Sequence, residues 1–240
     1  MGERPTQQSV PDLAGAPVEP WDLKIAVCIP STGSWESVTA DCVANMALCF
    51  QQAQYEGRHE VKVFSATGSI LTDNRHRLIA QAAQWGATHA LLLDADMTAP
   101  WDTIQVLLRH NQPVVAANCV RRMIQTYPTA WRSGEGYVYS RPESSGLEQV
   151  DRVGTAVMLI DMRVFEAIDL PYFLFEQDPE SPPGMIGEDI YFCDKLKEAG
   201  IPLYIDHDLS KLVKHWGTVG YTMQMALDAE DYYHRKEAEN

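Results

Sequence analysis

Short apolar runs alternate with amphipathic stretches along the first half of this chain. The apolar runs cover residues 24–30, 61–64, 89–93 and 113–117. Such runs are typical of strands buried on both faces, as in a parallel sheet. Helical patterns separate them, roughly from Trp35 to Gln54, from Asp73 (a candidate cap) to Gly86, and from Trp101 onward. Strands and helices alternating at this spacing predict right-handed βαβ units, and so an α/β fold with a mostly parallel central sheet.

The pattern becomes irregular after Asn118. We expect short strands and turns near residues 129–140, an apolar strand over 153–160, a short helix over 162–168, a loop over 173–185, a helix over 188–199 and a last strand over 203–205. The sequence therefore predicts one domain over residues 22–222. Its regular half, 22–118, would bind a nucleotide, and its irregular half, 119–222, would bind an acceptor. Residues 1–21 predict a flexible N-terminal tail, and residues 223–240 a C-terminal helix or tail.

Charge and cysteine content narrow the class of protein. Among 240 residues, 19 Lys and Arg face 33 Asp and Glu, which gives a net charge of −14. This surface would repel nucleic-acid phosphates overall, although it leaves room for a small basic groove. The 5 cysteines are odd in number and form no CxxC pair, which argues against a disulfide framework or a zinc knuckle. We find no long apolar run and no leader-like start, so we expect no membrane association and a cytoplasmic location.

Two carboxylates directly follow the buried run Leu91–Leu93. Asp94 and Asp96 would stand where open α/β sheets place their ligands, at the carboxyl end of a strand. Carboxylates two residues apart in a turn can both reach one hard cation such as Mg²⁺ or Mn²⁺, and a diphosphate would complete the coordination. The alternative is that both residues simply cap the next turn.

Three further features carry possible chemistry. Glu188 and Asp189 open a helix, where they either complement the helix dipole or supply a general base. His215 is an ordinary surface or core histidine unless it joins the carboxylates as a third metal ligand. Gly154 precedes an apolar strand, where it serves either a bulge or a close approach of a ligand to the backbone.

Taken in order, Asp94-x-Asp96, Gly154, Glu188-Asp189 and His215 resemble the motifs of the GT-A class of nucleotide-sugar glycosyltransferases. The resemblance covers roughly residues 22–220. The segments 154–159 and 187–193 are similar to those of compact bacteriophage glycosyltransferases, some of which modify hydroxymethylated DNA bases. The resemblance implies that the protein transfers a sugar from a nucleoside-diphosphate sugar, with a UDP-sugar favoured, to an acceptor hydroxyl, and that this transfer depends on Mn²⁺ or Mg²⁺. If the protein is phage-encoded, it would act in the cytoplasm of the bacterial host, with no obligate protein partner evident.

The resemblance also implies a role for each matching position. Asp96 and His215 would bind the metal, and Asp94 the metal, the ribose or the sugar. Asp189 would be the catalytic base of an inverting reaction, with Glu188 orienting it or the acceptor. The donor would be bound by residues of the first half and the glycine loop, namely Pro30, Thr32, Asp73, Arg75, Asp94 and Gly154.

The acceptor is less well defined. Residues 115–152 are locally basic and rich in aromatic side chains, which favours Arg121, Arg122 and Trp131 as acceptor-binding residues. A solvated, irregular surface explains the same composition. The acceptor is therefore modified DNA, a glycan, a protein or a small molecule.

Other functions remain open or are disfavoured by missing motifs. The first strand is followed by no GxGxxG, and the chain has no GxxxxGK[ST] and no GxSxG, which disfavours dinucleotide dehydrogenases, P-loop kinases and serine hydrolases. The loop after Pro30 lacks the basic, glycine-rich character of nucleotidyltransferases. A non-catalytic sugar-nucleotide-binding domain or an assembly module stands as the alternative to an enzyme.

Overall fold

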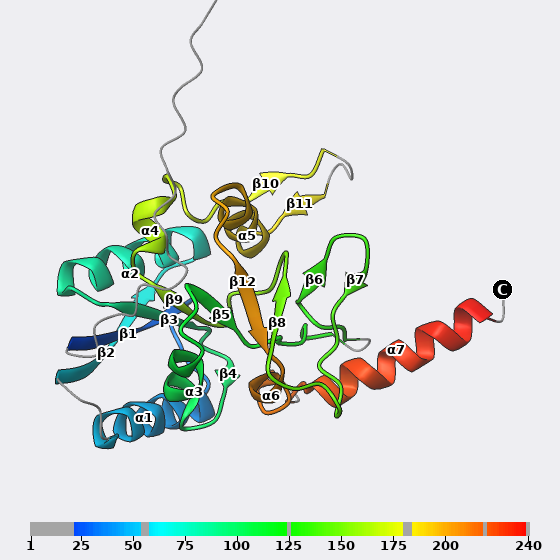
Figure 1. The fold of residues 1–240 in the computed structure, drawn as a ribbon, viewed down its shortest axis with the longest axis horizontal. Helices are drawn as coiled ribbons and strands as arrows, with labels where there is room; N and C mark the ends of the chain where they lie inside the picture. Colours follow the sequence, from blue (N-terminus) through cyan, green and yellow to red (C-terminus); the bar gives the residue numbers. More distant parts are fainter. Residues whose placement is uncertain (1–21, 54–57, 124–125, 180–183, 218–219, 239–240) are drawn as a thin grey trace, which may run out of the picture.

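The structure of the chain is a computed structural model that describes residues 22–53, 58–123, 126–179, 184–217 and 220–238. The predicted N-terminal tail, residues 1–21, lies outside the described residues. Figure 1 shows a mixed sheet with helices on both faces and one helix, α7, extending away from the body.

The central sheet has 7 strands in the order β2-β1-β3-β9-β5-β12-β8. Their bounds are Asp22–Ser31 (β1), Arg58–Thr67 (β2), His89–Leu93 (β3), Val114–Ala116 (β5), Leu147–Val150 (β8), Val157–Asp161 (β9) and Leu203–Asp206 (β12). Strands β2, β1, β3, β5 and β12 run in one direction, whereas β9 and β8 run antiparallel to their neighbours. The prediction of an α/β fold with a mostly parallel sheet is confirmed.

Helices cover both faces of this sheet, as the pattern of fully buried strands requires. They are Ser37–Gln52 (α1), Leu71–Trp85 (α2), Thr103–Arg109 (α3), Val164–Ala167 (α4), Glu188–Glu198 (α5), His207–Ser210 (α6) and Met223–Ala238 (α7). One core joins α2, α4 and α5 to one face of the sheet. The other joins α1, α3 and α6 to the opposite face. Residues of β1 and β3 alternate between the two cores, so both faces of these strands are covered by helices.

Three two-stranded ladders complete the fold. They are β4 (Met97–Thr98) with β13 (Lys214–His215), β6 (Trp131–Arg132) with β7 (Gly136–Tyr137), and β10 (Glu176–Gln177) with β11 (Met185–Ile186). The last ladder lies in the segment where we expected only a loop, so that prediction was incomplete. In each ladder the strands are two residues long, too short to produce a readable period.

The predicted cap of α2 is wrong. Asp73 does not cap this helix: the cap position is Ile70, no side chain caps the helix, and Asp73 lies within the first turn. Gly86 does end α2, in the left-handed conformation with φ of 77°.

Candidate functional site

The antiparallel insertion of β9 brings the glycine loop beside the acidic turn. Leu93, the last residue of β3, pairs with Val157, the first residue of β9. The backbone N–H of Asp94 donates to the carbonyl of Ala156 over 3.0 Å. Residues 153–156 therefore lie near the carboxyl end of β3. If β9 were parallel to β3, these residues would lie at the opposite edge of the sheet.

A short ladder carries His215 to the acidic turn across 119 residues of chain. His215 pairs with Met97, which directly follows Asp96. The backbone N–H of Trp216 donates to the carbonyl of Asp96 over 2.7 Å, and the Trp216 indole N–H donates to the Thr98 hydroxyl over 2.8 Å. These bonds hold residues 214–216 against residues 96–98.

The Asp96 carboxylate has two basic neighbours. Its Oδ2 lies 3.2 Å from His215 Nε2 and 2.7 Å from Arg122 Nη1. Burial opposes ionisation of Asp96, but the hydrogen bond with His215 and the charges of His215 and Arg122 outweigh it, so its pKa is lowered. Burial likewise disfavours protonated His215, but its bonds to Asp96 and to the Val120 carbonyl prevail and raise its pKa.

Arg75 connects the other acidic residue of the turn to helix α5. Its Nη2 lies 3.0 Å from Asp94 Oδ1, and its Nε lies 3.5 Å from Glu188 Oε1. Only 2% of the Arg75 side chain is exposed, and its guanidinium lies 5.8 Å from the centre of the Phe173 ring. Because two carboxylates flank one buried guanidinium, Arg75 fixes the distance between the end of β3 and the start of α5.

The start of α5 presents two carboxyl groups in different surroundings. Glu188 is buried, which raises its pKa; Arg75 opposes this rise, and Asp189 and Asp94 add to it. Asp189 is half-buried, and its Oδ1 accepts a hydrogen bond of 2.8 Å from the N–H of Ile190. A Cβ on Gly187 would lie 2.6 Å from that Oδ1, so the glycine gives the Asp189 carboxylate its position.

The two acidic residues of the turn point to different partners: Asp94 to Arg75, and Asp96 to His215 and Arg122. Within the described ranges, no three His, Cys, Asp or Glu side chains are arranged to hold a metal ion. The pair of Asp96 and His215 nevertheless suits one. Since a carbonyl can only accept, His215 Nδ1 donates to Val120, 2.9 Å away, and Nε2 faces Asp96. This backbone bond is the usual support of a metal-binding histidine.

The predicted donor residues lie in different settings. Pro30 is buried at the end of β1, and Thr32 is exposed just beyond it. Asp73 is exposed and pairs with Arg77 over 3.2 Å. A Cβ on Gly154 would lie 3.2 Å from the Thr129 side chain, so packing alone accounts for this glycine. The donor-binding role of these residues stays a prediction.

The sequence assigned no role to Asn74, although its neighbours Asp73 and Arg75 were predicted to bind the donor. This buried side chain donates to the Ser31 carbonyl over 3.2 Å and to the Gly68 carbonyl over 2.9 Å, so it joins the end of β1 to the loop after β2.

The predicted acceptor residues belong to an aromatic and basic surface. Arg121 donates to the Tyr127 hydroxyl over 2.8 Å and stacks on its ring, and the Tyr127 and Tyr137 ring centroids lie 4.8 Å apart. Trp131 lies under the guanidinium of Arg152 at 5.5 Å. Tyr137 is 47% exposed, which leaves one ring of this surface accessible to a ligand.

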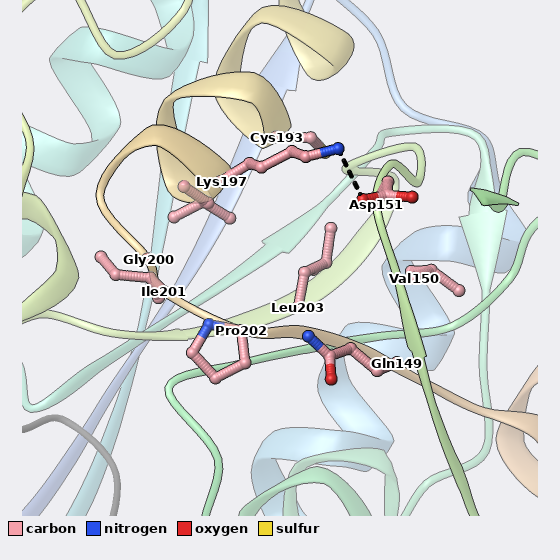
Figure 2. A pocket seen from close by; sticks show the side chains of 10 residues that line it. Gln149, Val150, Asp151, Cys193, Lys197, Gly200, Ile201, Pro202 and Leu203 are labelled. Carbon is pink, nitrogen blue, oxygen red and sulfur yellow. Dashed lines mark hydrogen bonds and ion pairs between the residues drawn. The ribbon is translucent and has the colours of Figure 1, made fainter. Parts of the chain in front are cut away.

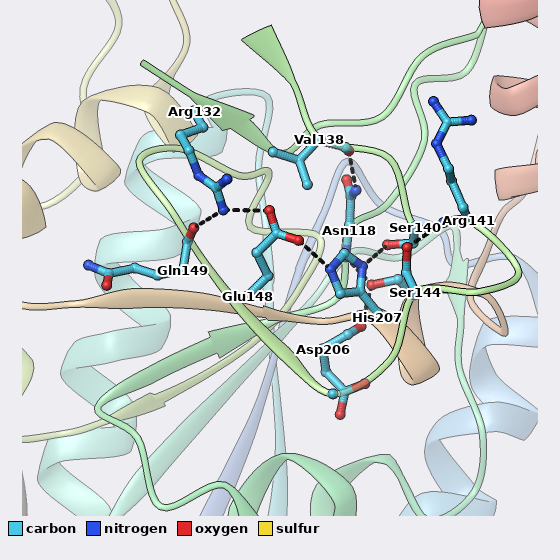
Figure 3. Close-up of polar contacts among 12 residues, drawn as sticks. Asn118, Arg132, Val138, Ser140, Arg141, Ser144, Glu148, Gln149, Asp206 and His207 are labelled. Atoms are coloured by element: carbon cyan, nitrogen blue, oxygen red, sulfur yellow. Dashed lines mark hydrogen bonds and ion pairs between the residues drawn. The ribbon is translucent and has the colours of Figure 1, made fainter. Parts of the chain in front are cut away.

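A polar chain in the second half, buried at His207 and Ser140, also escaped the sequence reasoning (Figure 3). His207 Nδ1 lies 2.9 Å from Ser140 Oγ, its Nε2 lies 2.7 Å from Glu148 Oε2, and Glu148 bonds to Arg132. Ser140 is 1% exposed, so this serine is not accessible as a nucleophile. The chain joins β6 and β8 to α6 and has no recognisable spacing, because its members come from elements far apart in the sequence.

Among the cavities of the described residues, two of the best formed lie away from this site. Figure 2 shows one of about 250 Å³ between β8, β12 and the end of α5, where Lys197 bonds to Asp151 over 2.8 Å. Another, of about 560 Å³, is lined mainly by apolar side chains of α2 and α4. No predicted site residue lines either cavity.

Comparison with known proteins establishes the fold. The chain matches no protein-family model and no curated protein. Its structure is similar to that of A197 from STIV, with a TM-score of 0.55 and 15% identity, over 85% of this chain and 91% of that one. It also resembles S. aureus TarS 1-349, solved in complex with UDP-GlcNAc, with a TM-score of 0.49 and 13% identity, over 84% of this chain and 61% of that one.

At 15% identity, the likeness to A197 shows a shared fold and no more. In the described part of the chain, no helix is both long and apolar enough to cross a bilayer. The chain has a mixed α/β domain with a mostly parallel seven-stranded sheet, an architecture consistent with a GT-A-like, Rossmann-type domain.

Proposed function

We propose that this protein is a metal-dependent glycosyltransferase that moves a sugar from a nucleoside-diphosphate sugar, preferably a UDP-sugar, to an acceptor hydroxyl. The observation that carries the proposal is the gathering of four separate segments at the carboxyl end of β3. The acidic turn meets His215 through Asp96, and it meets the acidic start of α5 through Arg75. This edge is where open α/β sheets bind their ligands.

The donor diphosphate would lie at the turn. Asp96 and His215 would hold Mn²⁺ or Mg²⁺, which when bound neutralises charge on the leaving diphosphate. Arg75 contacts Asp94 and would hold its carboxylate in position to bind the ribose or the sugar. Pro30 and Thr32, at the end of the neighbouring strand β1, would flank the base.

Asp189 would take the proton from the acceptor hydroxyl. Its half-buried carboxylate is the more accessible of the two at the start of α5. Glu188 is buried and held by Arg75, so it would orient Asp189 or the acceptor rather than take up the proton itself. A carboxylate base within hydrogen-bond reach contributes about 10²–10⁴-fold to the rate.

The acceptor side would be the surface that carries Arg121, Arg122 and Trp131. Its accessible ring, Tyr137, and the guanidinium of Arg121 suit a planar, uncharged group such as a base. We propose a hydroxymethylated base in DNA as this acceptor. The net charge of −14 predicts weak, salt-sensitive binding of such DNA.

The test is sugar transfer measured by mass spectrometry, with nucleotide sugars offered against hydroxymethylated DNA, unmodified DNA and glycans. We expect Mn²⁺ or Mg²⁺ to stimulate transfer, Asp96→Ala to abolish that stimulation, and Asp189→Asn to lower kcat by roughly 10²-fold or more with unchanged donor affinity. Asp102→Ala and Glu198→Gln are the matched controls. Asp102 makes no cap bond on α3, and Glu198 is an exposed carboxylate at the far end of the helix that Asp189 opens.

Each outcome has a distinct meaning. Donor binding without transfer to any acceptor would point to a non-catalytic binding domain, and no binding at all would point to an assembly module. Native turnover by Asp189→Asn would remove that residue from the mechanism. Transfer to a glycan but not to modified DNA would refute the DNA acceptor alone.

A further inference from the structure

One oxygen of the proposed metal site already has a cationic partner. Arg122 Nη1 lies 2.7 Å from Asp96 Oδ2, the same oxygen that faces His215, and also donates to the carbonyl of Trp216 over 3.1 Å. The side chains of Arg122 and Asp96 are 47% and 25% exposed, so the contact can open toward solvent.

The backbone around this contact leaves room for the Arg122 side chain. A Cβ on Gly217 would lie 2.7 Å from Arg122 Cδ and 3.4 Å from its Cγ. Any larger residue at position 217 would therefore displace the arginine stem. On the other side, the carbonyl of Val120 accepts from His215 Nδ1, which fixes the chain two residues before Arg122. The segment that carries His215 therefore constrains Arg122 in two ways: Gly217 leaves room for its side chain, and His215 holds the backbone at Val120.

We propose that Arg122 and a divalent cation exclude each other at Asp96. In the metal-free protein the guanidinium is the counter-cation of Asp96. A divalent ion that ligates Oδ2 repels a guanidinium hydrogen-bonded to the same oxygen, so binding of the ion requires Arg122 to leave. The inference rests on the proposed metal site and adds to it a residue that sets its affinity.

The experiment measures Mn²⁺ binding to the full chain by calorimetry and by the electron paramagnetic resonance of free Mn²⁺. Loss of a half-exposed ion pair predicts roughly two- to fivefold tighter binding to Arg122→Ala than to the wild type. Arg121→Ala removes the same charge from the adjacent residue, whose guanidinium contacts Tyr127 and not Asp96, and should change the affinity by less than about twofold. Gly217→Ala keeps the charge but displaces the arginine, and should tighten binding as Arg122→Ala does.

Equal or weaker Mn²⁺ binding by Arg122→Ala, with binding by the wild type intact, would overturn the inference and leave the metal site standing. An equal gain for Arg121→Ala would also overturn it, because general electrostatics would then explain the effect. If neither the wild type nor Arg122→Ala binds Mn²⁺, the metal site and this inference both fail. Asp96→Ala, which should bind no Mn²⁺ at the site, identifies the signal.

Discussion

Arg75 lies between the two acidic segments of the candidate site. Both of its partners, Asp94 and Glu188, are carboxylates, and only 2% of its side chain is exposed. A buried charge of this kind is tolerated because it is paired, and removing one partner leaves the other charges uncompensated. The residue is therefore part of the stability of the fold as well as of the site.

We predict that Arg75→Met lowers the free energy of unfolding by about 3 kcal/mol. Methionine retains much of the volume but leaves Asp94 and Glu188 without their counter-charge. Urea unfolding followed by circular dichroism measures the effect. Lys197→Met, which removes a mostly exposed ammonium paired with Asp151 on the surface of α5, should cost less than about 1 kcal/mol. Equal losses in the two variants would contradict the buried role of Arg75.

Sequence reasoning placed Arg75 near the nucleotide but not between two carboxylates. A buried arginine has no hydrophobic signature, and its partners lie 19 and 113 residues away in the chain. By contrast, the order of Asp96 and His215 in a family-like set predicted their neighbourhood. Their convergence depends on the ladder between Met97 and His215, which no local pattern reveals.

Helix α2 shows how far local signals extend at the scale of an element. Its apolar face and its end at Gly86 follow from the sequence, because a left-handed residue after a helix is most often glycine. Its start was wrong because Asp73, a good capping residue, forms an exposed ion pair inside the first turn instead. Among the strands, β3 was predicted with its observed bounds, whereas the direction of β9 was not readable, because strand direction depends on the connection rather than on composition.

At Gly86 we predict a loss of about 1 kcal/mol in the free energy of unfolding for Gly86→Ala. The residue has φ of 77°, and an added Cβ meets no atom within 4 Å, so backbone strain is the whole cost. Gly86→Asn should lose less, since asparagine tolerates this conformation better. Urea unfolding of the three proteins gives the comparison. An alanine variant as stable as the wild type would show that the helix end relaxes.

At the scale of the whole molecule, the two halves of the chain share one sheet. Strand β9, from the second half, lies between β3 and β5 of the first, and β12 lies beyond β5. The sequence predicted a regular and an irregular half, but it could not show this insertion. Since the central strands of each half pair with the other, we expect the described domain to unfold as one cooperative unit.

His89 lies where β3 meets β9, opposite Asp161, and its protonation is therefore linked to global unfolding. Burial lowers the pKa of His89 to about 4 from 6.5; Asp161 acts in the opposite direction, and Arg163, paired with Asp161, adds to the lowering. Between pH 6.5 and pH 4 the unfolded chain binds the proton and the folded chain does not. Stability contributed by neutral His89 is thus complete above pH 6.5 and is lost as the pH falls toward 4, by about 3 kcal/mol.

The measurement is the free energy of unfolding of the wild type minus that of His89→Asn, followed from pH 7 to pH 4. Asparagine keeps a polar side chain but takes up no proton in this range, so acidic residues that titrate in both proteins cancel in the difference. We expect the difference to change by about 3 kcal/mol, with the wild type losing relative stability as the pH falls. A difference that stays constant across this range would mean that the sheet opens enough at β3 and β9 to hydrate His89, and the halves would then not be coupled through this strand pair.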